Sequence, residues 1–131
     1  MTGIDTNVLV RYIVQDDPVQ SDLATVFIDQ LTDSDPGLIE LIVLIELTWV
    51  LTSAYRCAKS DVVRVLEQVL ITNCFDIEQS DIAWKALRLY KDGAADFSDY
   101  CIANINQSRG ASHTVTFDRK AAKFRLFKLL E

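Results

Sequence analysis

The sequence predicts an α/β fold in which helices cover both faces of a parallel sheet, and three observations carry this prediction. The chain has 131 residues, about the length of one domain, and half of them are hydrophobic. Only four Gly and two Pro occur, which excludes a disordered or collagen-like chain. Short runs of strand-forming residues alternate with amphipathic stretches, an order typical of parallel strands joined by right-handed crossovers.

The first half of the chain is expected to begin with a strand and to continue mainly as helices. Asp17 followed by Pro18 predicts a helix start, because aspartate caps backbone N–H groups and proline is tolerated at the first helical position. The expected elements are a strand at residues 1–4, a helix opened by 8–14, a helix at 18–31, a strand or helix approach at 38–41, a helix reaching about 55 and a helix capped at 60–61.

The second half is expected to alternate strands and helices more evenly. Either Asp96 or Ser98 caps a helix that Arg109 and Gly110 end. The expected elements are a strand at residues 75–77, a helix capped at 80–81 and reaching about 91, the helix ending near 108, a strand at 114–117 and a last strand within 124–130. No linker or internal repeat interrupts this order, so we expect one domain over residues 1–131.

Five acids stand where chemistry is expected in such a sheet. Asp5 and Asp118 each follow a strand, Asp96 and Asp99 open a helix, and Glu46 lies within a helix. Ligands of parallel α/β sheets collect beyond the carboxyl ends of the strands. Taken singly, Asp5, Asp96 and Asp118 could be helix caps, and Asp99 could lie in a first turn where the helix dipole favours an acid. Glu46 could pair with an arginine. Taken together, the five acids favour a shared site.

Glu46 is the most informative of these acids because it lies in the apolar run LIVLIELTWVL, residues 41–51. We expect this run to form a buried helix. A buried carboxylate without a partner would cost several kcal/mol. The sequence therefore predicts that Glu46 faces a cation.

The acids suggest a divalent metal rather than zinc. Carboxylates that converge on one edge repel one another, which raises their pKa values unless a cation lies among them. Oxygen ligands without His or Cys are the set that Mg²⁺ or Mn²⁺ prefers. The single histidine, His113, has no partner for a zinc site and is expected in a surface loop. Two such ions about 4 Å apart suit the hydrolysis of phosphodiester bonds.

The remaining composition is typical of a cytoplasmic protein. The three cysteines show no CxxC spacing, so we expect them to be reduced. The start lacks the basic region of a signal peptide, and no apolar run reaches the roughly 20 residues of a membrane helix. The net charge of −6 argues against a strongly basic nucleic-acid binder. Residues 118–131 differ, because they hold five Lys or Arg and two acids.

Four stretches, DTNVLVRYIVQDDP, VLIELTWVL, ADFSDYCIA and TFDRKAAK, occur in an order and at spacings that resemble the PIN-domain family. Within that family they are similar to the VapC-type ribonuclease toxins of bacterial toxin–antitoxin pairs. The resemblance spans nearly the whole chain. It implies a three-layer α/β/α fold with a short central parallel sheet, a single PIN-like domain over residues 1–131 and a metal-dependent endoribonuclease activity.

The resemblance also implies roles for individual residues. The catalytic, metal-binding acids would be Asp5, Glu46, Asp99 and Asp118, with Asp96 as either a fifth ligand or only a helix cap. Thr6 and Thr116 could hold metal-bound water through their hydroxyls, and Asn7 could orient Asp5. Glu40 stands where such proteins often have a small polar residue.

Three partners follow from the same resemblance. RNA is expected to contact cations near the acids, namely Arg11, Arg119, Lys120 and Lys123. A cognate VapB-like antitoxin is expected to cover the acidic groove with its C-terminal segment, whose arginine could displace a metal. A homodimer through the apolar N-terminal helices is also expected.

Two other functional classes stay open on the sequence. A receiver-like phosphoacceptor domain also has strand-end aspartates, but such domains usually carry a lysine after the last core strand, where this chain reads TFDRK. A non-catalytic PIN-like module would act only through protein contacts, yet a scaffold would not require all four acids.

Overall fold

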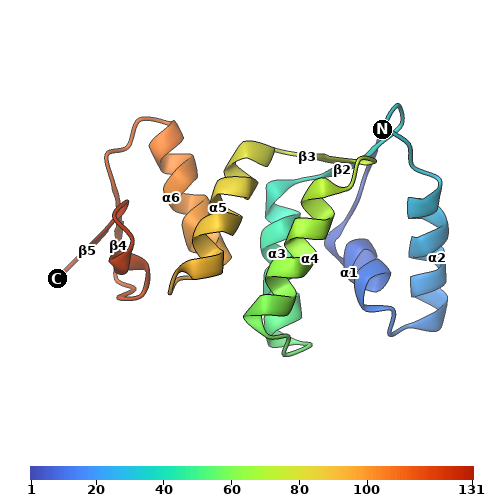
Figure 1. Cartoon of the computed structure of the whole chain (residues 1–131), viewed down its shortest axis with the longest axis horizontal. Helices are drawn as coiled ribbons and strands as arrows, with labels where there is room; N and C mark the ends of the chain where they lie inside the picture. Colours follow the sequence, from blue (N-terminus) through green and yellow to red (C-terminus); the bar gives the residue numbers. More distant parts are fainter. The chain divides into compact units, whose positions relative to one another are not determined.

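The structure, a computed structural model, describes all 131 residues and divides into two compact units (Figure 1). The N-terminal unit comprises Met1–Ser80, and the C-terminal unit comprises Asp81–Glu131. Each unit combines helices with parallel strands, which confirms the α/β class.

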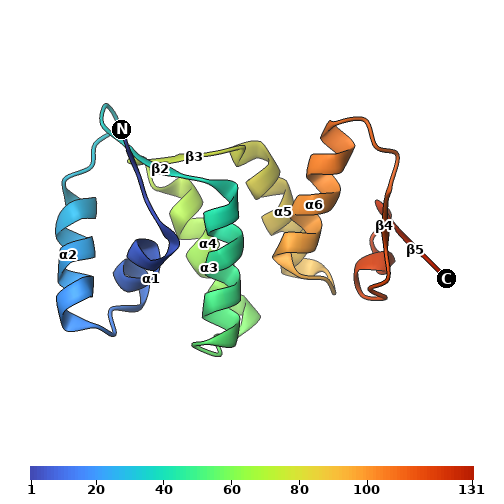
Figure 2. The same ribbon diagram turned by 180° about the vertical axis from the view of Figure 1, so that it is seen from behind.

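The N-terminal unit contains three strands and four helices. In chain order they are β1 (Thr2–Gly3), α1 (Thr6–Val14), α2 (Pro18–Asp29), β2 (Gly37–Ile39), α3 (Leu41–Ser53), α4 (Lys59–Ile71) and β3 (Phe75–Ile77). The strands pair in parallel in the order β1-β2-β3, with Thr2 opposite Gly37 and Leu38 opposite Asp76. Helix α1 packs beside α2, and α3 packs beside α4, as both ribbon views show (Figures 1 and 2).

The C-terminal unit contains two long helices and a two-stranded parallel sheet. Its elements are α5 (Ser80–Asp92), α6 (Phe97–Ser108), β4 (Thr114–Thr116), the short 3₁₀ helix η1 (Ala121–Lys123) and β5 (Phe127–Leu129). Thr114 lies opposite Phe127, and Thr116 lies opposite Leu129. The last strand therefore falls inside the expected range, and the sheet of this unit consists of β4 and β5.

Three helices, α1, α2 and α6, have an aspartate at the cap position. The Asp17 carboxylate accepts hydrogen bonds from the N–H groups of Val19 and Gln20 at 3.1 and 3.0 Å, as the Asp–Pro pair predicts. The expected cap of α4 at residues 60–61 is wrong by two or three positions, because the cap residue is Ala58. That helix begins at Lys59, and Asp61 lies in its first turn, where the helix dipole favours an acid.

The sequence left open whether residues 38–41 form a strand or lead into a helix, and the structure shows that they do both. A strand ends at Ile39, and α3 begins at Leu41 with only Glu40 between them. Gly37 in that strand packs closely, because a Cβ atom there would lie 2.5 Å from Cδ1 of Ile4 and that side chain would have to shift. This tight packing holds β2 against the end of β1.

The core of each unit is apolar and closely packed. The largest side chains with almost no exposed surface are Leu9, Ile39, Leu44, Leu47, Leu51, Val62 and Leu66 in the N-terminal unit and Phe97 and Cys101 in the C-terminal unit. All three cysteines are free thiols, as expected, and burial raises the pKa of Cys101 to about 12. None of the helices combines the length and apolar character needed to span a membrane.

Candidate active site

Asp5 lies just beyond the carboxyl end of β1 and caps α1. Its carboxylate accepts a hydrogen bond from the N–H of Thr6 at 2.8 Å, while its backbone remains extended. The side chain is exposed, so its carboxylate is also accessible to a ligand. The cap and the ligand interpretations of Asp5 are therefore compatible.

Glu46 on α3 is joined to the same place by a side-chain contact. The Thr6 hydroxyl donates a hydrogen bond to Oε1 of Glu46 at 2.8 Å. The N-terminal unit thus brings Asp5, Thr6 and Glu46 together, although the last is 40 residues from Thr6. This contact uses the Thr6 hydroxyl to orient a carboxylate.

The expectation that Glu46 is buried is wrong. Helix α3 buries Leu44 and Leu47, but Glu46 is exposed together with Ile42 and Trp49, which lie on the same side at positions i−4 and i+3. The prediction failed because α3 is hydrophobic on almost all sides, so its sequence does not show which stripe is exposed to solvent. The cost of burying its charge therefore does not apply.

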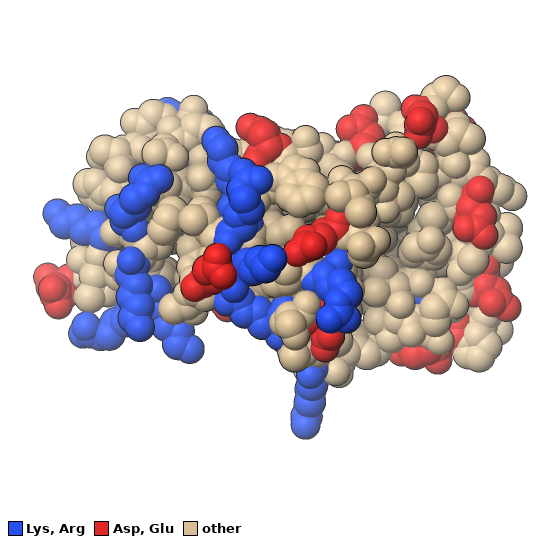
Figure 3. All heavy atoms as spheres, in the orientation of Figure 1, with Lys and Arg blue, Asp and Glu red and all other residues tan.

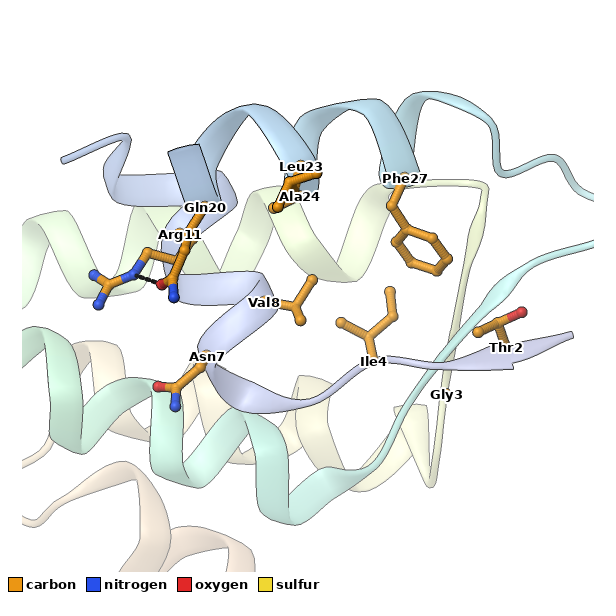
Figure 4. A pocket seen from close by; sticks show the side chains of 10 residues that line it. All are labelled: Thr2, Gly3, Ile4, Asn7, Val8, Arg11, Gln20, Leu23, Ala24 and Phe27. Carbon is orange, nitrogen blue, oxygen red and sulfur yellow. Dashed lines mark hydrogen bonds between the residues drawn. The ribbon is translucent and has the colours of Figure 1, made fainter. Parts of the chain in front are cut away.

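Asn7 and Arg11, also predicted as site residues, lie at a separate cavity of the N-terminal unit. They line a cavity of about 450 Å³ between β1, α1 and α2, whose other walls include Ile4, Val8 and Phe27 (Figure 4). Figure 4 shows these apolar side chains facing one another, with Arg11 at one end hydrogen-bonded to the side chain of an α2 residue. The cavity is apolar and contains none of the acids.

Arg11 is also held in a network that sequence reasoning missed. Its Nη1 donates to Oδ1 of Asp16 at 3.1 Å and to the Tyr55 hydroxyl at 3.0 Å, and that hydroxyl donates to Oδ2 of Asp16 at 2.8 Å. The hydrogen bond from Tyr55 lowers the pKa of Asp16, and a hydrogen bond to the same hydroxyl raises the pKa of Arg11. No local signal in the sequence connects residues this far apart.

The C-terminal unit brings the other predicted acids around a single cavity. Asp96, Asp99 and Asp118 line a cavity of about 310 Å³ together with Arg119 and Lys120. The sequence predicted all five of these residues. The sides of the cavity therefore carry both carboxylates and cations.

Asp96 and Asp99 occupy the cap and the third position of α6. The carboxylate of Asp99 accepts a hydrogen bond from the N–H of Asp96 at 3.1 Å, which is half of a capping box. Burial raises the pKa of Asp99, and the negative charges of Asp96 and Asp118 raise it further, against the opposing effect of that hydrogen bond. The repulsion expected among converging carboxylates is thus present at Asp99.

Asp118 sits in a turn that its own side chain stabilises. Its N–H donates to the Thr116 hydroxyl at 3.0 Å, and its carboxylate accepts from the N–H groups of Lys120 at 2.8 Å and Ala121 at 3.2 Å. Asp118 therefore binds the first N–H of the short 3₁₀ helix, but the cap position of that helix is Lys120 and not Asp118, which the sequence had suggested as a cap. Thr116 shapes the turn through its hydroxyl.

The donor atoms in both units fit a hard divalent cation in kind. Carboxylate oxygens occur without a neighbouring His or Cys ligand, and this set suits Mg²⁺ or Mn²⁺. His113 lies in an exposed loop, as expected, where its ring contacts the Ser112 hydroxyl. The donor types therefore fit, but the structure does not bring three or more Asp, Glu, His or Cys side chains within reach of a single ion.

Cations gather on the C-terminal unit. Figure 3 shows Lys and Arg side chains concentrated on this face over the region that carries the C-terminal elements. Arg119, Lys120 and Lys123 are all exposed. They place positive charge next to the acids of the cavity, where a phosphate would be attracted.

Comparison with known proteins agrees with these features. The family model described as PIN domain matches residues 4–126, and the chain therefore belongs to the PIN domain family. This membership confirms the expected fold class, α/β/α around a short parallel sheet. The chain is similar to a VapC ribonuclease of Aquifex aeolicus (strain VF5), with 23% identity over 124 residues, which are 94% of this chain and 91% of that protein. No solved structure gives a significant match.

Proposed function

We propose that this protein is a metal-dependent endoribonuclease and the toxin of a VapBC-type toxin–antitoxin pair. Membership of the PIN domain family and the similarity to a VapC ribonuclease support this proposal. The observation that carries it is the cavity where Asp96, Asp99 and Asp118 lie beside Arg119 and Lys120. Its carboxylates are oxygen ligands of the type that Mg²⁺ prefers, and its cations would attract an RNA phosphate.

The four acids would hold Mg²⁺ or Mn²⁺. They are Asp5, Glu46, Asp99 and Asp118, with Asp96 either as a further ligand or only as the cap of α6. When bound, the metal would lower the pKa of a water molecule and neutralise charge on the scissile phosphate. Burial and, after it, the charges of Asp96 and Asp118 raise the pKa of Asp99, and a bound cation would offset the repulsion between these carboxylates.

Other residues of the chain would position the acids and the RNA. Thr6 holds one oxygen of Glu46 through its hydroxyl. Thr116 fixes the turn that presents Asp118, and Asn7 would help to orient Asp5. Cations would bind RNA phosphates, and the residues proposed for this are Arg11, Arg119, Lys120 and Lys123.

The protein would act in the cytoplasm as a single PIN-like domain over residues 1–131. A cognate VapB-like antitoxin would inhibit it by covering the acidic groove with a C-terminal segment. An arginine of that segment would pair with the site carboxylates. Two copies of the chain would associate through the N-terminal helices.

The test is cleavage of single-stranded RNA by the purified chain with Mg²⁺, with Mn²⁺ and with EDTA. We expect cleavage only with metal, and a loss of about a hundredfold or more in the variants Asp5→Asn and Asp99→Asn. Asp81→Asn is the matched control, because Asp81 is an exposed acid in the first turn of α5. That variant should cleave like the wild type.

Two outcomes would contradict the proposal. If Asp5→Asn and Asp99→Asn fold and cleave at the full rate, the acids are wrongly assigned. If the wild type neither binds Mg²⁺ or Mn²⁺ in calorimetry nor cleaves RNA, a non-catalytic PIN-like module is favoured instead.

A further inference from the structure

Phe117 is an exposed aromatic side chain at the end of β4. Its side chain is 80% exposed, whereas Phe97 and Phe127 in the same unit are buried. Phe124 packs edge-on against Tyr100, with ring centroids 5.3 Å apart. Phe117 is the most exposed of the large hydrophobic side chains in the structure, so both faces of its ring are open to a planar partner.

The turn that carries Phe117 is held by hydrogen bonds on both sides. Before it, Thr116 is paired with β5, since its carbonyl accepts from the N–H of Leu130 at 2.9 Å. After it, the Asp118 N–H donates to the Thr116 hydroxyl, and the Asp118 carboxylate accepts from the Lys120 N–H. The backbone that carries the Phe117 ring is therefore fixed by hydrogen bonds on both sides.

Phe117 lies next to charged side chains that could bind the phosphate of a nucleotide. Asp118, Arg119 and Lys120 follow it directly, and all three line the cavity that also contains Asp99. The exposed cations there favour a polyanion (Figure 3). Proteins that bind single-stranded RNA combine cations for the phosphates with aromatic rings on which bases stack.

We propose that Phe117 stacks on a base of single-stranded RNA whose neighbouring phosphate lies in the cavity of Asp99 and Asp118. Arg119 and Lys120 contact phosphates of the same segment. Phe117 is thus a substrate-binding residue that aligns the strand with the acids. This inference rests on the proposed ribonuclease function.

The experiment measures RNA affinity in the Asp99→Asn background with Mg²⁺, using a fluorescent single-stranded RNA. Removing the ring in Phe117→Ala should weaken binding by about 5- to 150-fold, because base–aromatic stacking contributes about 1–3 kcal/mol and a factor of ten corresponds to about 1.4 kcal/mol. Phe117→Trp should restore the affinity. Val115→Ala is the matched control, because Val115 is 52% exposed and lies on the same strand.

Further measurements distinguish base stacking by Phe117 from a charge effect on RNA binding and from packing of the ring against protein. The salt dependence of binding should be unchanged in Phe117→Ala, whereas Lys120→Ala should reduce the slope of log affinity against log salt by about 0.7. An RNA that lacks the base at the stacked position should bind the protein with Phe117 and the Phe117→Ala variant with equal affinity. Thermal unfolding and gel filtration should be the same for Phe117→Ala and the parent protein.

The outcomes distinguish this inference from the function on which it rests. If the wild type cleaves RNA and Phe117→Ala binds and cleaves equally well, stacking is excluded and the ribonuclease proposal stands. If Phe117→Ala changes the unfolding temperature or the oligomeric state, the ring packs against protein, and stacking is likewise overturned. If the Asp99→Asn protein binds no RNA and the wild type cleaves no RNA, both proposals fail.

Discussion

The Thr6 hydroxyl and the Glu46 carboxylate are joined by a hydrogen bond of 2.8 Å that links the start of α1 to the middle of α3. The donor residue follows directly after Asp5, whose carboxylate binds the Thr6 N–H. Two predicted metal ligands are therefore connected to one threonine, by its backbone and by its side chain. This arrangement makes Thr6 a positioning residue for both.

Thr6→Val should fold and should cleave RNA about tenfold more slowly. Valine has nearly the same shape, but it cannot donate to Glu46, and a hydrogen bond to a charged group contributes about 1.5–3 kcal/mol. Thr6→Ser keeps the hydroxyl and should retain most of the activity. Cleavage rates measured over a range of Mg²⁺ concentrations would test this, since the valine variant should require more metal. Equal rates for all three proteins would exclude the positioning role.

Glu46→Gln should remain folded and lose both metal affinity and cleavage. The amide keeps the shape of the side chain and can still accept the hydrogen bond from Thr6, while the negative charge is removed. Calorimetric titration with Mn²⁺ and a cleavage assay would measure the two losses, and we expect at least a hundredfold lower rate. A variant that is badly destabilised but cleaves normally per folded molecule would instead indicate a structural ion pair.

The sequence was sufficient for features that depend on neighbouring residues. The Asp17 cap of α2 was predicted correctly from neighbouring residues, and the structure chooses Asp96 from the two caps, Asp96 and Ser98, that the sequence allowed for α6. The acids at the strand ends could be identified because their positions follow from the alternation of strands and helices. Asp118, which follows β4, lines one cavity together with Asp99 of α6.

Features that depend on distant contacts could not be predicted in the same way. The exposure of Glu46 depends on which stripe of α3 packs against its neighbours, and a helix that is apolar almost all round does not reveal that stripe. The contact between Asp16 and Tyr55 spans 39 residues, and the one between Leu41 and Glu78 spans 37. Such pairs are specified by packing, for which a single sequence carries no local signal.

Tyr55→Phe should destabilise the N-terminal unit, because it removes the hydroxyl that joins Arg11 to Asp16. The loss should be about 1 kcal/mol, which corresponds to a fall in Tm of about 3–5 °C for a chain of this size. Thermal unfolding followed by circular dichroism would measure it. Tyr12→Phe is the control, because the Tyr12 hydroxyl makes no hydrogen bond in the structure. Equal Tm values for both variants would show that the network contributes nothing.

Glu40 and Glu78 form an acidic pair that should make stability depend on pH. The Glu78 carboxylate accepts from the N–H of Leu41 at 3.0 Å, at the start of α3. A hydrogen bond from Glu40 to Glu78 raises the pKa of Glu40, and burial and the charge of Glu78 raise it further. A folded-state pKa above the ordinary value, about 4.3, means that the folded chain holds a proton that the unfolded chain releases.

The stabilisation from this pair should therefore be complete below pH of about 4.3 and should be lost as the pH rises through the raised pKa of Glu40. Glu40→Gln keeps a donor to Glu78 without a titrating proton, so its stability should not show this loss. We expect the variant to gain stability relative to the wild type between acidic and neutral pH. Unfolding temperatures measured from pH 3.5 to 7 would test this. Parallel curves for the two proteins would contradict the shared proton.

Gly93 and Tyr100 are in such close contact that Gly93→Ala should be destabilising. A Cβ atom at position 93 would overlap the Tyr100 hydroxyl and would lie 2.7 Å from the carbonyl oxygen of Leu89. Tyr100 is buried, and its hydroxyl accepts a hydrogen bond from the N–H of Ala95 at 3.4 Å, so the ring has little room to move. Overpacking of this kind costs about 1–3 kcal/mol.

The same substitution should also slow RNA cleavage, because Tyr100 directly follows Asp99 on α6 and its displacement would shift that carboxylate. Gly3→Ala is the matched control, since a Cβ atom there meets no neighbour within 4 Å. Removing the hydroxyl in the double variant Gly93→Ala with Tyr100→Phe should recover part of the lost stability, because one of the overlapping atoms is gone. Chemical denaturation of the four proteins would measure these differences. A Gly93→Ala protein as stable and as active as Gly3→Ala would show that the loop before α6 adjusts without moving Asp99.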